Sequence, residues 1–261
     1  MAWQLYQGDA LETLKQMEDE SINCCVTSPP YWGLRDYGVD GQLGLEPTPD
    51  EYVAKMVEVF REVKRVLRND GTLWLNLGDS YVGSWGNYGG QKRGMGSQRK
   101  IISGSRIHQE AYDGLEKWRP PTSNKINNLK PKDLAGIPWR VAFALQADGW
   151  WLRSDIIWAK PNPMPESVTD RPTKAHEYIF LLSKSERYFY DAEAIKEDAT
   201  SEFGRGVIDA KQKYSGNIGN QAHSGWMGGD GVTRNKRTVW NISIKPFSEA
   251  HFAVFPPDLI E

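Results

Sequence analysis

The chain has 261 residues, a formal net charge of −2 and 25% charged residues. This length is sufficient for one large domain with a substantial buried core. The near-neutral charge excludes a protein that binds nucleic acid through an overall basic composition, so any basic surface must be local. No apolar run approaches the length of a membrane span, and we therefore expect no membrane partner.

The two cysteines, Cys24 and Cys25, are adjacent in a short apolar stretch. Neighbouring residues of a strand point to opposite faces, so we expect two free thiols rather than a disulfide. Metal-binding partners at suitable spacing are also lacking, and no metal site is expected. Free thiols without a secretion signal are typical of a cytoplasmic protein.

The first thirty residues predict two strands with a helix between them. Trp3–Tyr6 is a short apolar stretch that ends in Gln7-Gly8-Asp9, and Ile22–Thr27 is a second one. Between them, Asp9 is a suitable N-cap for a brief amphipathic helix. The apolar positions of that helix are Ala10, Leu11, Leu14 and Met17. Strand, helix and strand joined by short links predict a βαβ unit in a parallel sheet.

The second strand ends in a rigid loop, Ser28-Pro29-Pro30-Tyr31. Each proline fixes its own φ, and the residue before each proline is held extended. The loop therefore presents a hydroxyl, carbonyl oxygens and an aromatic ring in fixed directions. This combination suits a site that grips a flat ring bearing an amine. The alternative is a proline-stiffened surface turn that follows a core strand.

A longer helix and a third strand follow. Apolar residues recur at helical spacing over Pro49–Leu67, Asn69-Asp70-Gly71 indicates a turn, and Thr72–Leu77 is strand-like. The apolar face of the helix consists of Val53, Met56, Val57, Phe60, Val63 and Leu67. This second β-α-β step places Asn76–Tyr81 beside Ser28–Tyr31 at the carboxyl ends of adjacent strands. Open parallel sheets bind their ligands at that edge.

Residues 82–132 differ in character, because glycine, serine, asparagine and basic residues replace the periodic pattern. The segment holds ten Lys and Arg against three Asp and Glu, a local excess of about seven positive charges, with four interleaved Trp and Tyr. A solvated loop is the simplest interpretation. Contact with nucleic-acid phosphates is the favoured one, because the segment follows the ligand edge and carries aromatic residues. The expected contacts are Lys92, Arg93, Arg99, Lys100 and Arg106.

Periodic structure resumes after this insertion. A helix is predicted to begin near Pro138 and to end at Asp148-Gly149. Trp150–Trp158 and Glu177–Leu182 are strand-like and predict an antiparallel hairpin at the far edge of the sheet. A second glycine-rich insertion with a smaller basic excess spans about 199–237, and Thr238–Ser243 is again strand-like.

Ser-Pro-Pro-Tyr after an apolar strand resembles the catalytic motif of S-adenosylmethionine-dependent amino-methyltransferases that act on DNA. The serine form is associated with N4-cytosine enzymes, whereas Asp or Asn in its place is more usual in N6-adenine enzymes. The phrases Ile157–Lys160, Lys174–Tyr178 and Ala250–Leu259 are also similar to segments of that family. Their order resembles the permuted, β-type arrangement of these enzymes.

The resemblance implies an α/β fold with a Rossmann-like class I methyltransferase sheet and an antiparallel hairpin at its edge. Residues 1–81 and 133–261 would form the catalytic domain, and 82–132 and about 199–237 would be inserted loops for target recognition. It also implies S-adenosyl-L-methionine as the cofactor and double-stranded DNA as the partner. The residues implied in cofactor binding are Gly8, Asp9, Ala10, Phe255 and Pro256.

The same resemblance implies roles for the loop. Ser28 Oγ and the Pro29 carbonyl are expected to accept hydrogen bonds from the target amine, while Tyr31 stacks on a base flipped out of the duplex. Asn76 and Asp79 are secondary candidates, because some relatives place an acid near this strand end. Asn76 cannot act as a base, so Asp79 either takes that role or caps a turn.

The family's glycine-rich donor loop, of the kind Asp-x-Phe-x-Gly-x-Gly, is expected about a dozen residues after Phe255, whereas the sequence ends at Glu261. We therefore expect the central donor-binding strands to be missing from this chain, and either a C-terminal segment or a second chain to complete the sheet. The preferred function is an N4-cytosine DNA methyltransferase of restriction-modification or phage type. The alternatives are an N6-adenine enzyme, a non-catalytic DNA-binding fragment or half of a split enzyme.

Overall fold

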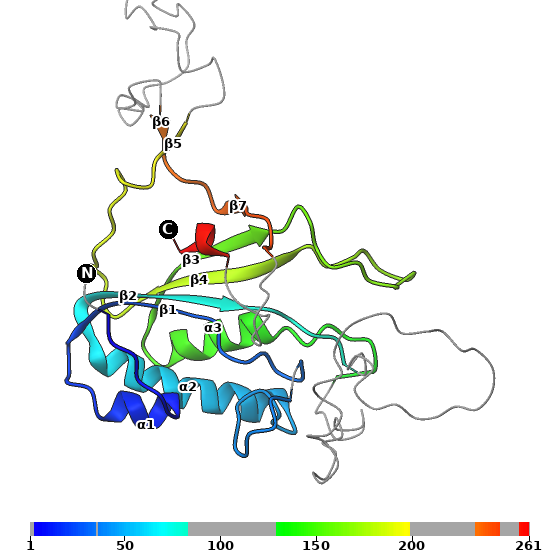
Figure 1. Ribbon diagram of the computed structural model, residues 1–261, viewed down its shortest axis with the longest axis horizontal. Helices are drawn as coiled ribbons and strands as arrows, with labels where there is room; N and C mark the ends of the chain where they lie inside the picture. Colours follow the sequence, from blue (N-terminus) through cyan, green and yellow to red (C-terminus); the bar gives the residue numbers. More distant parts are fainter. Residues whose placement is uncertain (1–2, 35, 83–128, 199–232, 246–255, 261) are drawn as a thin grey trace, which may run out of the picture.

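A five-stranded mixed sheet with three helices on one face forms the fold (Figure 1). The computed structural model describes residues 3–34, 36–82, 129–198, 233–245 and 256–260. The helices are α1 (Ala10–Lys15), α2 (Pro49–Val66) and α3 (Ile137–Ala147), together with the 3-10 turn η4 (Pro257–Leu259). The strands are β1 (Ile22–Thr27), β2 (Leu67–Leu77), β3 (Trp151–Ala159), β4 (His176–Ser183), β5 (Glu197–Asp198), β6 (Thr233–Arg234) and β7 (Val239–Asn241). No helix in these ranges is long and apolar enough to cross a membrane.

The main sheet has the strand order β1-β2-β4-β3-β7. β1 and β2 are parallel and are joined through α2, whereas β4 is antiparallel to both β2 and β3. This arrangement confirms the predicted α/β class and the antiparallel hairpin on the side away from β1. The short β7 adds one parallel strand outside β3. Within the described residues, β1 pairs on one side only, and completion of the sheet beyond it remains a prediction.

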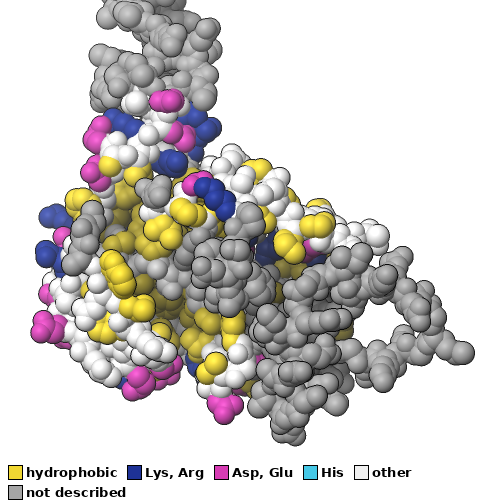
Figure 2. Space-filling view, viewed as in Figure 1, with side chains coloured by type: hydrophobic (Ala, Val, Ile, Leu, Met, Phe, Trp, Pro, Cys, Tyr) yellow, Lys and Arg dark blue, Asp and Glu magenta, His cyan; other side chains and the backbone are white. Residues whose placement is uncertain are grey.

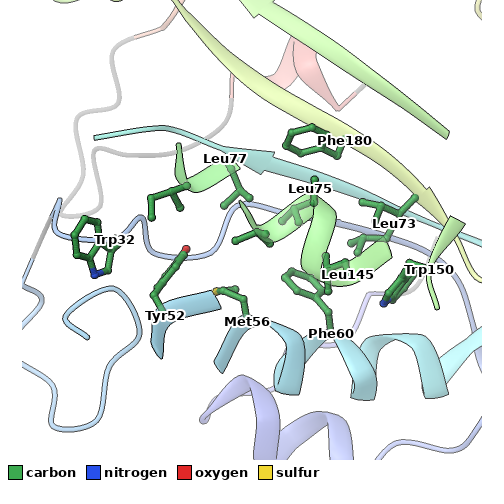
Figure 3. Close-up of a cluster of buried hydrophobic side chains, with 14 of the residues drawn as sticks. Trp32, Tyr52, Met56, Phe60, Leu73, Leu75, Leu77, Leu145, Trp150 and Phe180 are labelled. Atoms are coloured by element: carbon green, nitrogen blue, oxygen red, sulfur yellow. The ribbon is translucent and has the colours of Figure 1, made fainter. Parts of the chain in front are cut away.

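The sheet face that carries α2 and α3, here called the helical face, holds the main hydrophobic core. α2 begins after Thr48, whose side chain accepts a hydrogen bond from Glu51 N, and has a proline in its first turn. Figure 3 shows side chains of α2 directed at the strands and at α3. The fully buried members include Tyr52, Met56, Phe60, Leu73, Leu75, Leu77, Ile137, Leu145, Phe180 and Leu182. The predicted limits of both helices agree with the structure to within about one residue.

The opposite face, here called the tryptophan face, carries Trp74, Trp158 and Trp240. Its buried cluster is small and consists of Ile156, Trp158 and Ile179, against which Trp74, Trp240 and Leu259 pack while remaining partly exposed. A hollow of about 930 Å³ lies over this face between β1, β2 and the C-terminal turn η4. Hydrophobic side chains, drawn in yellow, reach the molecular surface over the strand layer (Figure 2).

The prediction of a first strand at Trp3–Tyr6 is wrong. These residues are irregular, and the Trp3 and Leu5 side chains are 86% and 81% exposed. A strand is stabilised by a neighbour that accepts its backbone hydrogen bonds. No strand in the described part of the chain pairs with Trp3–Tyr6, so the apolar pattern alone does not produce one. The N-cap and the helix that follow were predicted correctly, because Asp9 Oδ1 accepts a hydrogen bond from Glu12 N at 3.0 Å.

The prediction that a turn at Asn69-Asp70-Gly71 separates the helix from a strand beginning at Thr72 is also wrong. β2 runs without a break from Leu67 to Leu77, but its pairing with β1 shifts register inside this stretch. Ile22 pairs with Leu67 and Cys24 pairs with Thr72, so the turn-forming residues bulge out of the ladder. The residues with turn propensity thus form an irregularity in a strand rather than its beginning.

Both expected insertions leave the described fold through short antiparallel pairings. Val82 N donates to Asp133 O at 2.9 Å, and Lys132 N donates to Val82 O at 2.7 Å. β5 and β6 pair in the same way on either side of residues 199–232. Residues 83–128 and 199–232 lie outside the described part, so the division into catalytic domain and recognition loops stays a prediction. The expected DNA contacts Lys92, Arg93, Arg99, Lys100 and Arg106 lie there as well.

Candidate active site

The loop after β1 and the end of β2 meet at one edge of the sheet, as the sequence predicts. Tyr31 approaches Gly78 so closely that a Cβ on Gly78 would lie 2.5 Å from Tyr31 Cε2. Only a residue without a side chain leaves room for the ring at this position. Gly78 therefore allows Tyr31 to cross the strand end and brings its hydroxyl to β2 and β4.

The Tyr31 hydroxyl is the centre of a polar cluster. It lies 2.7 Å from Glu177 Oε2 and 2.9 Å from Asn76 Oδ1, and Ser28 Oγ donates to it at 3.1 Å. Asn76 Nδ2 donates to the Tyr178 carbonyl at 3.1 Å, which directs Asn76 Oδ1 at the tyrosine. Burial, followed by the charge of Glu177, raises the pKa of Tyr31 well above its usual range, so the phenol keeps its proton.

Glu177 connects this cluster to the β3–β4 hairpin. Its Oε1 forms a close ion pair with Lys160, and both side chains are only 17% exposed. Lys160 also lies over the Trp158 ring, 4.2 Å from its centroid. The sequence interpretation did not name Glu177 as a site residue. The available signal was a lone acid at the start of an otherwise apolar, aromatic strand.

Hydrogen bonds to α2 and to the segment that precedes α2 fix the Ser28–Tyr31 loop and the adjoining Trp32. Tyr52 on α2 donates to the Pro30 carbonyl at 2.9 Å, and the buried Trp32 ring donates to the Glu46 carbonyl at 2.9 Å. Burial raises the pKa of Tyr52, with a further contribution from Glu46. Ser28 remains exposed at the rim, while Pro29 and Pro30 are half-buried. The loop therefore combines a fixed backbone with an accessible hydroxyl.

Asp79 caps α3 from outside the helix. Asp79 Oδ1 accepts from Ile137 N at 3.0 Å and Oδ2 accepts from Gly136 N at 3.1 Å. Two backbone donors at a helix start are a favourable place for a carboxylate. Of the two roles expected for Asp79, the structure shows the cap, and a role as proton acceptor remains a prediction.

Lys174 lies beside this cap, and its ammonium donates to the Asp79 carbonyl at 2.9 Å. Burial lowers the pKa of Lys174, opposed by the nearby carboxylates of Asp79 and Glu177.

The residues expected to bind the methyl donor are described only in part, and their role in donor binding stays a prediction. The Asp9 carboxylate is engaged in the cap of α1, which packs with the helical face through Leu14. Pro256 is buried next to η4, whose Leu259 packs on the tryptophan face. Phe255 lies outside the described residues.

Comparison with known proteins identifies the family of the chain. A family of DNA methylases (N6_N4_Mtase) matches residues 22–261. The type II methyltransferase M.Cfr9I of Citrobacter freundii is 46% identical over 256 residues, which cover 98% of this chain and 69% of that protein. M.SmaI of Serratia marcescens is 46% identical over 253 residues, covering 95% of this chain and 70% of that protein.

Among solved structures, the fold is similar to the PvuII DNA methyltransferase, described as cytosine-N4-specific, with a TM-score of 0.45 and 20% identity. The match covers 72% of this chain and 51% of that one, so the chain spans about half the length of this structure. The sequence relationships are much closer than this structural one, and they cover nearly the whole chain. On that basis, the chain belongs to the N6/N4 family of DNA methylases.

Proposed function

We propose that this chain carries the target-amine site of a type II DNA methyltransferase and that its substrate is the exocyclic N4 amine of cytosine in duplex DNA. The family match and the type II methyltransferases at 46% identity support the reaction class. Support for cytosine comes from the serine at position 28, the form associated with N4-cytosine enzymes. The observation that carries the proposal is the exposed Ser28 hydroxyl, fixed by Tyr31 at the end of β1.

The chemistry requires acceptors rather than a base before transfer. The lone pair of the cytosine amine is delocalised into the ring, so the nitrogen is a poor nucleophile. Two acceptors that draw its N–H bonds to one side make the nitrogen pyramidal and direct its lone pair at the incoming methyl carbon. Ser28 Oγ and the Pro29 carbonyl are the proposed acceptors. Ser28 donates its own proton to Tyr31, which leaves the lone pairs of its oxygen for the amine.

A base in a stacked duplex cannot reach this loop, so base flipping is part of the proposal. One base stacked on an aromatic ring recovers about 1–3 kcal/mol of the unstacking cost. Tyr31 is the proposed stacking partner. The basic insertions outside the described residues are the proposed contacts to DNA phosphates.

S-adenosyl-L-methionine is the proposed methyl source and supplies an electrophilic methyl group when bound. The curated relatives extend well beyond the matched part, since this chain covers 69–70% of their length. We propose that a further segment or a second chain provides the rest of the donor site.

Product analysis tests the proposal directly. The protein, together with the segment or second chain that completes the donor site, is incubated with unmethylated duplex DNA and S-adenosylmethionine. The DNA is then digested and analysed by nucleoside mass spectrometry. N4-methylcytosine is the expected product. N6-methyladenine would instead support the adenine alternative. Absence of both products, together with no calorimetric binding of S-adenosylmethionine, would leave a DNA-binding fragment as the better description.

A further inference from the structure

Two acceptors compete for one proton in the Tyr31 cluster. The phenol carries a single proton, yet both Glu177 Oε2 at 2.7 Å and Asn76 Oδ1 at 2.9 Å lie within hydrogen-bonding distance of its oxygen. Hydrogen bonds to a charged acceptor are shorter and roughly twice as strong as neutral ones. The proton therefore goes to Glu177, and Asn76 supports the hydroxyl as a weaker second acceptor.

The direction of this bond sets the direction of the next one. Because Tyr31 donates to Glu177, the lone pairs of its oxygen face Ser28, and Ser28 Oγ donates to them at 3.1 Å. The three groups form one chain of hydrogen bonds that begins at the exposed rim of the site and ends at a partly buried carboxylate. Every donor along it points inward.

We propose that Glu177 is the final proton acceptor of a relay that runs from the target amine through Ser28 and Tyr31. The proposal rests on the proposed function, because the proton in question is one that methylation makes acidic. Glu177 does not touch the base. It is a positioning residue that also receives the proton, and it belongs to the hairpin rather than to the Ser28–Tyr31 loop.

The relay balances in atoms and charge. As the methyl group bonds to the amine nitrogen, positive charge develops on that nitrogen, which still carries two hydrogens, and the relay removes one of them during this step. One N–H bond breaks and its proton joins Ser28 Oγ, the Ser28 proton passes to the Tyr31 oxygen, and the Tyr31 proton passes to Glu177 Oε2. The products are a neutral methylamino group and a neutral carboxylic acid, with no oxidant or co-reactant. Glu177 then returns the proton to water before the next turnover.

Lys160 completes the assignment. Removing an isolated carboxylate from water is costly, and an ion pair offsets part of that cost. Lys160 Nζ binds Glu177 Oε1 and leaves Oε2 to Tyr31, so the two oxygens have separate tasks.

The test is Glu177→Gln in the protein with its donor site completed by the further segment or second chain. Glutamine has nearly the same shape and can still accept the Tyr31 hydrogen bond, but it cannot take up a proton at neutral pH. We expect the single-turnover methylation rate to fall about 100-fold, as is typical when a proton-transfer group is lost. The KM for DNA should stay within about twofold, because binding in the ground state is unchanged. Fluorescence of 2-aminopurine at the target position should be unaffected, since flipping precedes the relay.

Two further variants separate the relay from a purely structural role. Lys160→Met combined with Glu177→Gln removes both charges and should remain as slow as Glu177→Gln. Recovery in this double variant would assign the loss to an unpaired lysine and overturn the relay. Glu166→Gln is the matched control, because Glu166 is in the same hairpin and pairs with Arg171 at 2.7 Å. It should retain the wild-type rate.

The outcomes distinguish this proposal from the one on which it rests. A wild-type protein that has a complete donor site and still methylates neither cytosine nor adenine overturns both. Wild-type methylation together with an unchanged rate in Glu177→Gln overturns the relay alone. Circular dichroism and urea unfolding of each variant check that a lower methylation rate is not caused by unfolding. Loss of 2-aminopurine fluorescence in Glu177→Gln would also contradict the relay.

Discussion

The two faces of the sheet use the same strands for different purposes. On the helical face, Phe60, Leu75 and Phe180 are at most 1% exposed and pack into one continuous core. On the tryptophan face, Trp74 and Trp240 are only partly buried beside a hollow of about 930 Å³. Because side chains alternate along a strand, Leu75 contributes to the core while its neighbour Asn76 faces the polar cluster. Along β2, alternate residues therefore contribute to the hydrophobic core and to the polar cluster.

The largest expected effect is on the helical face. Phe60→Ala should lower the free energy of unfolding by about 3–5 kcal/mol, because it leaves a cavity in a close-packed core. The matching change on the other face, Trp240→Ala, should cost only about 1 kcal/mol, since that side chain is already partly exposed. Urea unfolding followed by circular dichroism measures both. Similar losses at the two positions would show that the faces do not differ in this way.

Ser28→Ala is expected to act on chemistry without affecting stability. Its hydroxyl is exposed and contributes little to the core, but it is the proposed acceptor for the amine. We expect kcat to fall about 100-fold, equivalent to about 2.7 kcal/mol of activation free energy. The DNA dissociation constant and the urea midpoint should be nearly unchanged. Equal losses in kcat and in DNA affinity would contradict the assigned role.

Substitutions of Asp79 test whether a side chain at the edge of the sheet contributes to the free energy of unfolding. Asp79→Ala removes the acceptor for two backbone donors of α3 and should cost about 0.5–2 kcal/mol, the usual range for a lost cap. Asp79→Asn is the matched variant, because it keeps one acceptor oxygen and should recover part of that loss. If Asp79→Asn were fully stable but inactive, the proton-acceptor role would be favoured over the cap. Thermal unfolding and methylation assays on the same samples give both answers.

The smallest expected effect is a difference in alkylation rate between two neighbouring cysteines that lie on opposite faces of β1. Cys24 is exposed beside the hollow, whereas Cys25 packs against the core of the helical face. Burial raises the pKa of the Cys25 thiol to about 11, so at pH 8 it is almost entirely protonated. The thiolate is the reactive form, and we expect iodoacetamide to modify Cys24 well before Cys25. Peptide mass spectrometry over time checks this, and Cys24→Ser should remove the fast phase.

Periodicity predicted the helical face well. α2 and α3 could be identified because their apolar residues recur at helical spacing and because caps and prolines mark their ends. The strand at Trp3–Tyr6 and the turn at Asn69-Asp70-Gly71 were wrong for a common reason. Both depend on which strand lies alongside, and a short stretch of sequence contains no information about that neighbour.

The candidate site was predictable only in part for a related reason. Ser28-Pro29-Pro30-Tyr31 is contiguous, and its place at a strand end follows from the β-α-β pattern. Glu177 is 146 positions from Tyr31 in sequence and reaches it only because β4 pairs with β2. The lone acid at the start of an apolar strand indicates a site residue, but the local sequence does not identify Tyr31 as its partner.

The stems at the two insertions have a consequence for how such enzymes can diversify. The residues on either side of each insertion are hydrogen-bonded to one another. Val82 pairs with Asp133 at the first insertion, and β5 pairs with β6 at the second. When the two ends are already joined, doubling the length of the intervening chain adds only about 0.6 kcal/mol of closure entropy. These hydrogen-bonded pairs therefore fix the two ends of each insertion independently of its length. Cassettes of different length and composition could be exchanged at them while the sheet, the core and the polar cluster keep their geometry.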